Sequence, residues 1–351
     1  MRRIAIISIN GVANVGGVER VVADHQRALS EIATVKLFSL PPWRSIRGVR
    51  IVNALLTACF AMVSSSMARV WAGPKGVVMS HGYSSIGMFC DLVFAHGCWA
   101  GYVEKTGNTM GKFGRIIYTV EWLAAHLAHR IIGVSDRVID QWTHYYGMSP
   151  ARSMVLLNSV QTHVFYPQPG AEDPCVGNEL HVLFVGRFEL GKGMLYLSTL
   201  HNEIIFERSR VHLVICSPTA VQETIIQQYP LFEFKYGLSP EQVAEEYSRA
   251  DMFLLPSLYE AFELSSIEAL ACGTPVLLND TGARPTLEML SCPGVFRLEE
   301  ADSPLRAVRQ AAERFRGLPR LALAAWTQKH FGGQNLRLDL LRLCGIEGAA
   351  S

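Results

Sequence analysis

The sequence has little charge and lacks several patterns that would identify other classes of protein. Only 18% of its 351 residues are charged and 49% are hydrophobic, which excludes an extended disordered chain. The eight cysteines form no C-x-x-C pair and none stands at zinc spacing from histidines. We therefore expect reduced, mostly buried thiols in a cytosolic protein. Neither half contains G-x-G-x-x-G followed by an acid about 20 residues on, which disfavours a nicotinamide oxidoreductase.

Long apolar runs are also scarce. The chain begins MRRIAIISIN, whose apolar stretch is too short for a signal peptide and is expected to form a first strand. Residues Ile51 to Val63 are strongly apolar, but this stretch is too short and interrupted to predict a membrane span. Two interpretations stay open, a packed helix and a helix lying at a membrane surface, the second favoured by the arginines that flank it. The length itself predicts two domains.

The charge is divided unevenly between the two halves. Residues 1–170 carry 16 Lys or Arg against 8 Asp or Glu, a net of +8, whereas residues 171–351 carry 16 against 23, a net of −7. The basic positions include Arg44, Arg47 and Arg50, and a Gly/Lys segment from Gly101 to Arg115 that is expected to be a loop. Such charge favours an anionic surface or acceptor, with ordinary solvated charge as the alternative.

The most informative stretch runs from Pro256 to Pro275. It follows an apolar run that predicts a buried strand, and its helix pattern ends at Gly273. Glu260 lies in the loop and Glu268 on the helix, with seven residues between them. At the carboxyl end of a strand, backbone N–H groups at a helix N-terminus attract an anion, so the pattern indicates a diphosphate held by backbone and a sugar held by acids. A capping box with Ser265 as N-cap is the alternative for Glu268 alone.

Other chemistry-bearing residues follow predicted strands elsewhere in the chain. The apolar run His181 to Val185 leads into Gly186-Arg187, with Lys192-Gly193 beyond it. An arginine fork and a lysine point charge suit two adjacent phosphates, although a solvated basic turn is the alternative. In the first half, Gly16-Gly17 open a predicted helix, and two predicted strands end at His81 and His96.

Together these motifs resemble the retaining glycosyltransferases of family 4, also called glycosyl transferases group 1. The resemblance is carried by Pro256, Ser257, Glu260, Phe262, Glu268, Gly273, Thr274 and Pro275, by G-R-x-x-x-x-K-G from Gly186 to Gly193, and by G-G-x-E from Gly16 to Glu19. It implies the GT-B fold, an α/β architecture of two Rossmann-like domains with parallel sheets facing across a cleft. The expected domains are 1–168 on the acceptor side, 169–325 for the nucleotide sugar, and a last helix in 326–351 that packs back on the first. The alternation of strand and helix patterns independently favours this class.

The resemblance also implies an activity and a set of site residues. The activity is transfer of a sugar from a UDP-type or GDP-type nucleotide sugar to an acceptor hydroxyl, with retention at the anomeric carbon and with no metal or other cofactor. His96, or His81 as the second choice, would contact the transferred sugar, and Glu260 its hydroxyls. The donor-binding residues would be Gly17, Arg187, Lys192, Tyr236, Phe262, Glu263, Leu264 and Glu268.

The resemblance and the charge also bear on the acceptor and the location. The short middle of the first domain and its basic charge favour a saccharide or lipid-linked saccharide in bacterial lipopolysaccharide or cell-surface polysaccharide assembly, and no nucleic acid. The expected location is the cytoplasm, with peripheral contact to the inner face of the membrane. Glu263 stands where the family has glycine, so either it turns to solvent or donor binding is altered. This departure, with Ser159 and Thr286, leaves a non-catalytic binding or scaffold protein on the same fold as the alternative.

Overall fold

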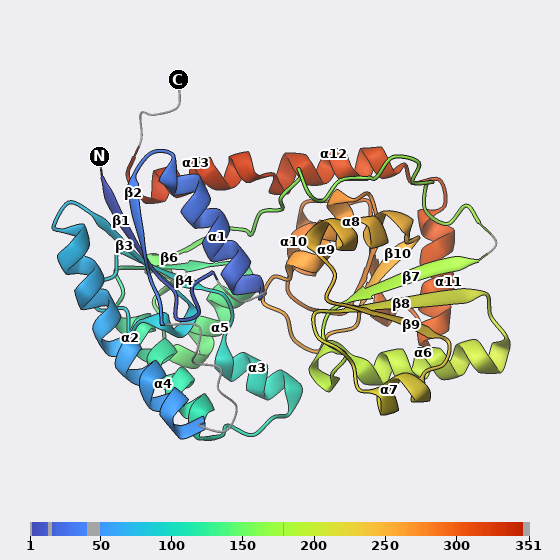
Figure 1. The fold of residues 1–351 in the computed structure, drawn as a ribbon, viewed down its shortest axis with the longest axis horizontal. Helices are drawn as coiled ribbons and strands as arrows, with labels where there is room; N and C mark the ends of the chain where they lie inside the picture. Colours follow the sequence, from blue (N-terminus) through green and yellow to red (C-terminus); the bar gives the residue numbers. More distant parts are fainter. Residues whose placement is uncertain (1, 13–15, 41–49, 178, 347–351) are drawn as a thin grey trace. The chain divides into compact units, whose positions relative to one another are not determined.

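A computed structural model describes residues 2–12, 16–40, 50–177 and 179–346. They form two units: one runs to Asn158 and resumes at Gln334, and the other is Ser159–Gly333 (Figure 1). Each unit contains a six-stranded sheet, with strand orders β2-β1-β3-β4-β5-β6 and β12-β11-β10-β7-β8-β9. All ten strand pairings within these sheets are parallel. The predicted α/β class with two parallel sheets is confirmed.

The N-terminal unit places helices against a sheet of short apolar strands. Its strands are β1 (Arg3–Ile7), β2 (Thr34–Phe38), β3 (Val77–His81), β4 (Leu92–Ala95), β5 (Arg130–Gly133) and β6 (Ser153–Val155). Its helices are α1 (Gly17–Ser30), α2 (Arg50–Ala72), α3 (Trp99–Thr106), α4 (Lys112–Leu127), α5 (Asp136–Tyr146) and, late in the chain, α13 (Gly333–Leu343). The core joins Ile4 and Ile6 of β1 to Leu336 and Leu340 of α13. The inner strands β1, β3, β4 and β5 are buried almost throughout, as expected for a covered parallel sheet, whereas the edge strands β2 and β6 are partly exposed.

The C-terminal unit repeats the alternation of strands and helices. Its strands are β7 (Leu180–Val185), β8 (Val211–Ser217), β9 (Phe232–Tyr236), β10 (Met252–Leu255), β11 (Val276–Leu278) and β12 (Val295–Arg297). Its helices are α6 (Met194–Glu207), α7 (Glu223–Gln228), α8 (Pro240–Arg249), α9 (Leu264–Ala271), α10 (Arg284–Met289), α11 (Pro304–Phe315) and α12 (Arg320–Phe331). The buried Arg320 guanidinium donates to the carbonyls of Ala250 and Gly273, at the ends of α8 and α9. It thereby fixes the end of the helix that carries Glu268.

The boundaries between the units differ from those predicted. The break falls after Asn158, not after residue 168, because Val160 N–H donates to the Phe331 carbonyl (2.8 Å) and so attaches its segment to the C-terminal unit. The Pro- and Gly-containing stretch that follows Tyr166 is also anchored there, since Cys175 N–H donates to the Asp251 carboxylate (2.6 Å). The predicted terminal segment 326–351 begins inside α12, which belongs to the C-terminal unit.

The segment Gly101 to Arg115 is largely helical, so the predicted loop is wrong. It contains most of α3, a break at Gly107 in the left-handed conformation (φ +65°), and the start of α4. The first turn of α3 is held by distant side chains: the Glu121 carboxylate accepts from Trp99 N–H (2.9 Å), and the Tyr146 hydroxyl accepts from Ala100 N–H (3.2 Å). These acceptors satisfy N–H groups that a helix start leaves unpaired.

Helix α2 is longer than the apolar stretch predicted, running through Ser64 to Ser66 as far as Ala72. Its window Leu55–Ala72 has a mean hydropathy of 1.3 and is one-third buried, so by length and composition it is able to cross a membrane. Those two criteria alone are weak support for a span, because α2 also packs against β1, β3 and α4 as a covering helix of the sheet. Arg44 and Arg47 lie outside the described residues.

Candidate active site

The basic turn after β7 is fastened to the loop after β10. Lys192 ends a short 3₁₀ turn that starts at Leu190, and Gly193 follows with φ +88°, in the left-handed region. A Cβ at Gly193 would lie 2.3 Å from the Pro256 carbonyl oxygen, so only glycine fits there. Leu258 N–H donates to the Gly191 carbonyl (3.0 Å). Since β7 and β10 are neighbours in the sheet, two motifs far apart in sequence meet at its carboxyl edge.

Two predicted site residues from these motifs form an ion pair. Lys192 Nζ lies 2.6 Å from Glu260 Oε1, and both side chains are mostly buried, with 27% and 11% of their surfaces exposed. Arg187 is exposed and pairs with Glu189 at 3.1 Å. The pair places a cation and an acid side by side at this edge of the sheet.

Glu263 is the N-cap residue of α9, and its side chain points into the protein. Its Oε1 accepts from the Ser266 hydroxyl (2.6 Å) and its Oε2 from Ala283 N–H (3.0 Å). The interpretation in which Glu263 turns to solvent is therefore wrong. Burial, and then repulsion from Glu260, raises the pKa of Glu263 to about 7. Gly282 in the neighbouring loop leaves room for this inward orientation, because a Cβ at that position would lie 2.2 Å from Glu263 Oε2.

The other residues of this motif lie on α9 or just before it. Because the N-cap is Glu263, Ser265 lies inside the helix and the capping-box explanation of Glu268 is wrong. Glu268, Phe262 and Leu264 are all buried. Tyr236 ends β9, two strands from β7, and is half exposed before Gly237 in the left-handed conformation.

The N-terminal unit supplies a cluster of three histidines. His81 ends β3 and His96 directly follows β4, and His81 Nδ1 lies 2.9 Å from His96 Nε2. His25 of α1, which the sequence did not single out, packs edge-on against His81 with ring centroids 5.1 Å apart. Burial lowers the pKa of His96 to about 4, and burial together with the neighbouring rings lowers those of His25 and His81. The structure thus brings His96, the first choice from the sequence, into contact with His81, the second choice.

The remaining N-terminal candidate is Gly17, the first residue of α1. A Cβ there would meet no atom within 4 Å, so the protein's own packing does not require glycine. At Gly16 a Cβ would lie 2.1 Å from Glu19 Oε2, and that carboxylate also accepts from Asn10 (2.9 Å). Of the two glycines, only Gly16 has a close neighbour within the unit, the end of the Glu19 side chain.

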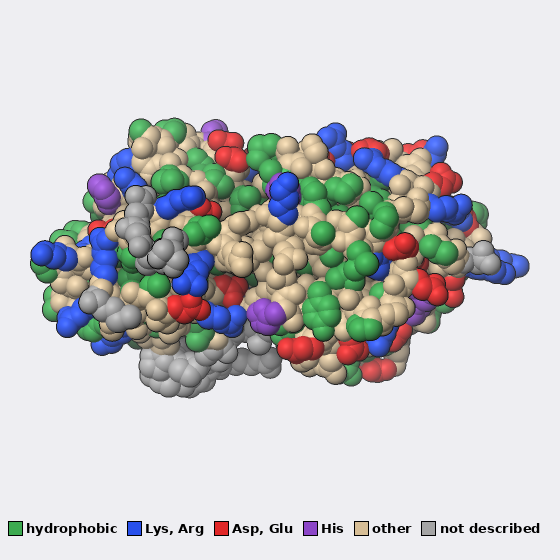
Figure 2. Space-filling view, turned by 90° about the horizontal axis from the view of Figure 1, so that it is seen from above, with side chains coloured by type: hydrophobic (Ala, Val, Ile, Leu, Met, Phe, Trp, Pro, Cys, Tyr) green, Lys and Arg blue, Asp and Glu red, His purple; other side chains and the backbone are tan. Residues whose placement is uncertain are grey.

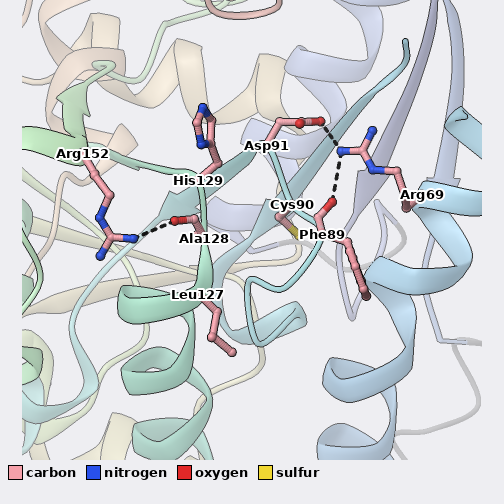
Figure 3. A pocket seen from close by; sticks show the side chains of 8 residues that line it. All are labelled: Arg69, Phe89, Cys90, Asp91, Leu127, Ala128, His129 and Arg152. Atoms are coloured by element: carbon pink, nitrogen blue, oxygen red, sulfur yellow. Dashed lines mark hydrogen bonds and ion pairs between the residues drawn. The ribbon is translucent and has the colours of Figure 1, made fainter. Parts of the chain in front are cut away.

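One pocket in the N-terminal unit lies at the other edge of its sheet, near the amino ends of β4 and β5 (Figure 3). Arg69 there pairs with Asp91 (2.6 Å) and donates to the Phe89 carbonyl, while Arg152 donates to the Ala128 carbonyl (2.9 Å). Both guanidinium groups serve the fold, and we assign this pocket no ligand. Over the described part of the chain, no group of three or more His, Cys, Asp or Glu is placed to hold a metal ion.

Comparison with known proteins shows which family the C-terminal unit resembles in sequence. Residues 179–302 match the family model described as glycosyl transferases group 1. Alpha-maltose-1-phosphate synthase of Mycolicibacterium smegmatis is 26% identical over 70% of this chain and 68% of its own length. The first four curated relatives are covered over 60 to 70% of their lengths.

Solved structures extend the likeness to the whole fold. Sucrose-phosphate synthase from Thermosynechococcus elongatus superposes with a TM-score of 0.78 at 20% identity, covering all of both chains. WaaG, a glycosyltransferase involved in lipopolysaccharide biosynthesis, superposes with a TM-score of 0.70 at 16% identity, covering 99% of this chain and 100% of WaaG. The family resemblance read from the sequence is confirmed: residues 179–302 match glycosyl transferases group 1, and the whole chain has the GT-B fold of these solved structures.

Proposed function

We propose that this protein transfers a sugar from a nucleotide-diphosphate sugar to an acceptor hydroxyl, with retention at the anomeric carbon and without a metal ion. The observation that carries the proposal is the partly buried Lys192–Glu260 pair, held by Gly193 beside the start of α9. In transfer, the bond between the anomeric carbon and the diphosphate breaks, and negative charge develops on the leaving phosphate. Lys192, Arg187 and the N–H groups at the start of α9 are the positive groups of this unit that would offset it.

The other candidates divide between the sugar and the nucleotide. Glu260 would accept hydrogen bonds from hydroxyls of the transferred sugar, and Glu268 from those of the ribose. The backbone at Tyr236 and Gly237 would meet the base. His96 would contact the transferred sugar from the N-terminal unit, and Gly17 would leave room for the donor at the start of α1. UDP and GDP sugars are the donors that we propose.

The decisive experiment has two stages. In the first, thermal unfolding is measured with UDP, GDP, ADP and CDP sugars, because a ligand that binds the native state raises the melting temperature. In the second, the stabilising donor is incubated with acceptor candidates, and the anomeric configuration of the product is read by NMR. Binding without transfer or donor hydrolysis would favour the alternative, a non-catalytic nucleotide-sugar-binding or scaffold protein.

For the acceptor we propose a saccharide or lipid-linked saccharide of the cell envelope, reached by a cytoplasmic protein bound peripherally to an anionic membrane. One support is the charge division, +8 against −7, and Figure 2 shows Asp and Glu gathered over the C-terminal unit. A second is one face of α2, here named the outer stripe, which exposes Leu55, Met62, Val63, Met67 and Val70. The stripe is apolar enough to enter an interface, and no Asp or Glu occurs between Glu31 and Asp91 to oppose anionic lipid.

A further inference from the structure

The contact between His81 and His96 follows from how β3 and β4 pair. In the parallel register His81 lies opposite Phe94, and His96 comes two residues after Phe94, so a strand's period of two points all three rings to one side. The His81 ring is stacked between the others, with centroids 4.7 Å from Phe94 and 5.1 Å from His96. The edge of His25 closes the cluster. The His81 imidazole therefore has little freedom to rotate.

The unpaired atom of His81 indicates the direction of its hydrogen bond. His81 Nε2 is buried and has no hydrogen-bond partner among the described residues. A neutral imidazole has one N–H donor and one acceptor nitrogen. If His96 donated, the proton of His81 would sit on Nε2 as an orphaned buried N–H, the rarer kind of unpaired polar group. If His81 donates from Nδ1, only a lone pair is left unpaired.

The second arrangement fixes the proton on His96 as well. When His96 Nε2 accepts from His81, the proton of a neutral His96 resides on Nδ1. Burial keeps both rings neutral at ordinary pH, because it lowers their pKa values. His96 Nε2 is engaged with His81, so Nδ1 is the nitrogen left to meet a substrate, and His96 is the less buried of the two residues.

We propose that His81 is a positioning residue which holds His96 in the Nδ1–H tautomer, so that His96 meets the sugar as a hydrogen-bond donor and not as an acceptor. The tautomer is a property of the pair alone. Its consequence for transfer rests on the proposed function, in which His96 contacts the transferred sugar. The oxygens that such a donor would recognise are the hydroxyl and ring oxygens of a sugar.

The tautomer can be measured directly in the full-length protein. With ¹⁵N-labelled histidine, long-range proton–nitrogen NMR correlations distinguish Nδ1–H from Nε2–H rings, and His96→Gln identifies the His96 signals. We expect His96 to be protonated at Nδ1, with Nε2 hydrogen-bonded. A His96 ring protonated at Nε2 overturns the proposal, whether or not the protein transfers sugar.

Three variants then test the consequence. His81→Phe keeps a ring stacked on Phe94 but removes the donor, and it should release the Nδ1–H preference and lower kcat by about tenfold or more with the donor KM unchanged. His81→Asn places an amide N–H where Nδ1 lies and should restore both the tautomer and most of the rate. His25→Phe is the matched control, since it changes the same cluster without touching this bond. A wild-type kcat in a folded His81→Phe protein would refute the positioning role. Inactivity of the wild-type protein would refute the proposed function instead, and the NMR measurement of the His96 tautomer would still test the hydrogen bond between the two histidines.

Discussion

Replacing Glu263 by glutamine should stabilise the protein, and more so as the pH rises. Glu263 is 8% exposed, lies beside Glu260, and is held by the Ser266 hydroxyl and Ala283 N–H. Glutamine has the shape of the protonated acid. Its carbonyl can accept from Ala283 N–H while its amide donates to the Ser266 hydroxyl, so the substitution removes the buried charge and keeps the hydrogen bonds.

The size and sign of the effect follow from the pKa. The pKa of Glu263 rises from 4.5 to about 7 on folding. The folded protein therefore binds more protons than the unfolded one between these values, and stability is lost as the pH rises through that window. Below about pH 4.5 the carboxyl is protonated in both the folded and the unfolded protein, so it does not lower the free energy of unfolding. At about 1.4 kcal/mol per pKa unit, ionisation lowers the free energy of unfolding by about 1 kcal/mol at pH 5 and by about 3 kcal/mol at pH 8.

The assay is urea unfolding of wild type and Glu263→Gln at pH 5 and pH 8. The variant should gain about 1 kcal/mol at the lower pH and about 3 kcal/mol at the higher. Glu223→Gln, an exposed carboxyl of the same unit, is the matched control and should change stability little at either pH. An equal gain at both pH values, or a loss at pH 8, would refute the inference that burial raises the pKa of Glu263.

Three further outcomes follow from the site. Lys192→Ala and Glu268→Ala should each lower transfer on the order of 100-fold while the protein stays folded by circular dichroism, and near-wild-type turnover in both would contradict the site. Transfer should survive EDTA, whereas loss of activity that manganese restores would contradict a metal-free mechanism. Sedimentation with anionic vesicles should succeed at low salt and fail with neutral lipid, since each basic residue near the surface contributes about 1 kcal/mol that salt screens. Serine at Met62 and Met67 of the outer stripe should weaken that binding, and an unchanged bound fraction would contradict docking through α2.

The elements that the sequence predicts well are those whose signal is local. The apolar runs of β1, β3, β7 and β10 and the glycine stop after α9 reappear within a few residues. The start of α3 was missed because its stabilising groups, Glu121 and Tyr146, lie far along the chain. The inward orientation of Glu263 could not be predicted for the same reason, because it depends on Ala283 in another loop.

The candidate site shows the same division. The motifs name Lys192 and Glu260, but their 2.6 Å contact depends on β7 and β10 being neighbours, which no local pattern encodes. Likewise, His81 and His96 each stand out as the end of a strand, while their hydrogen bond depends on the register between β3 and β4. The spacing of the motifs predicts which residues belong to the site. Which of them touch each other depends on the order and register of the strands.

The late position of α13 also constrains how the protein is made. Leu336, Leu340 and Cys344 complete a core whose other members, such as Ile4 and Ile6, leave the ribosome first. At about 5–20 residues per second, translation of the intervening unit takes on the order of ten to thirty seconds. Throughout that interval the nascent N-terminal unit lacks α13 and displays an unfinished apolar surface that chaperones could bind. The C-terminal unit is contiguous, so it can fold as soon as its own residues have emerged. The part of the protein synthesised first is therefore expected to reach its native state last.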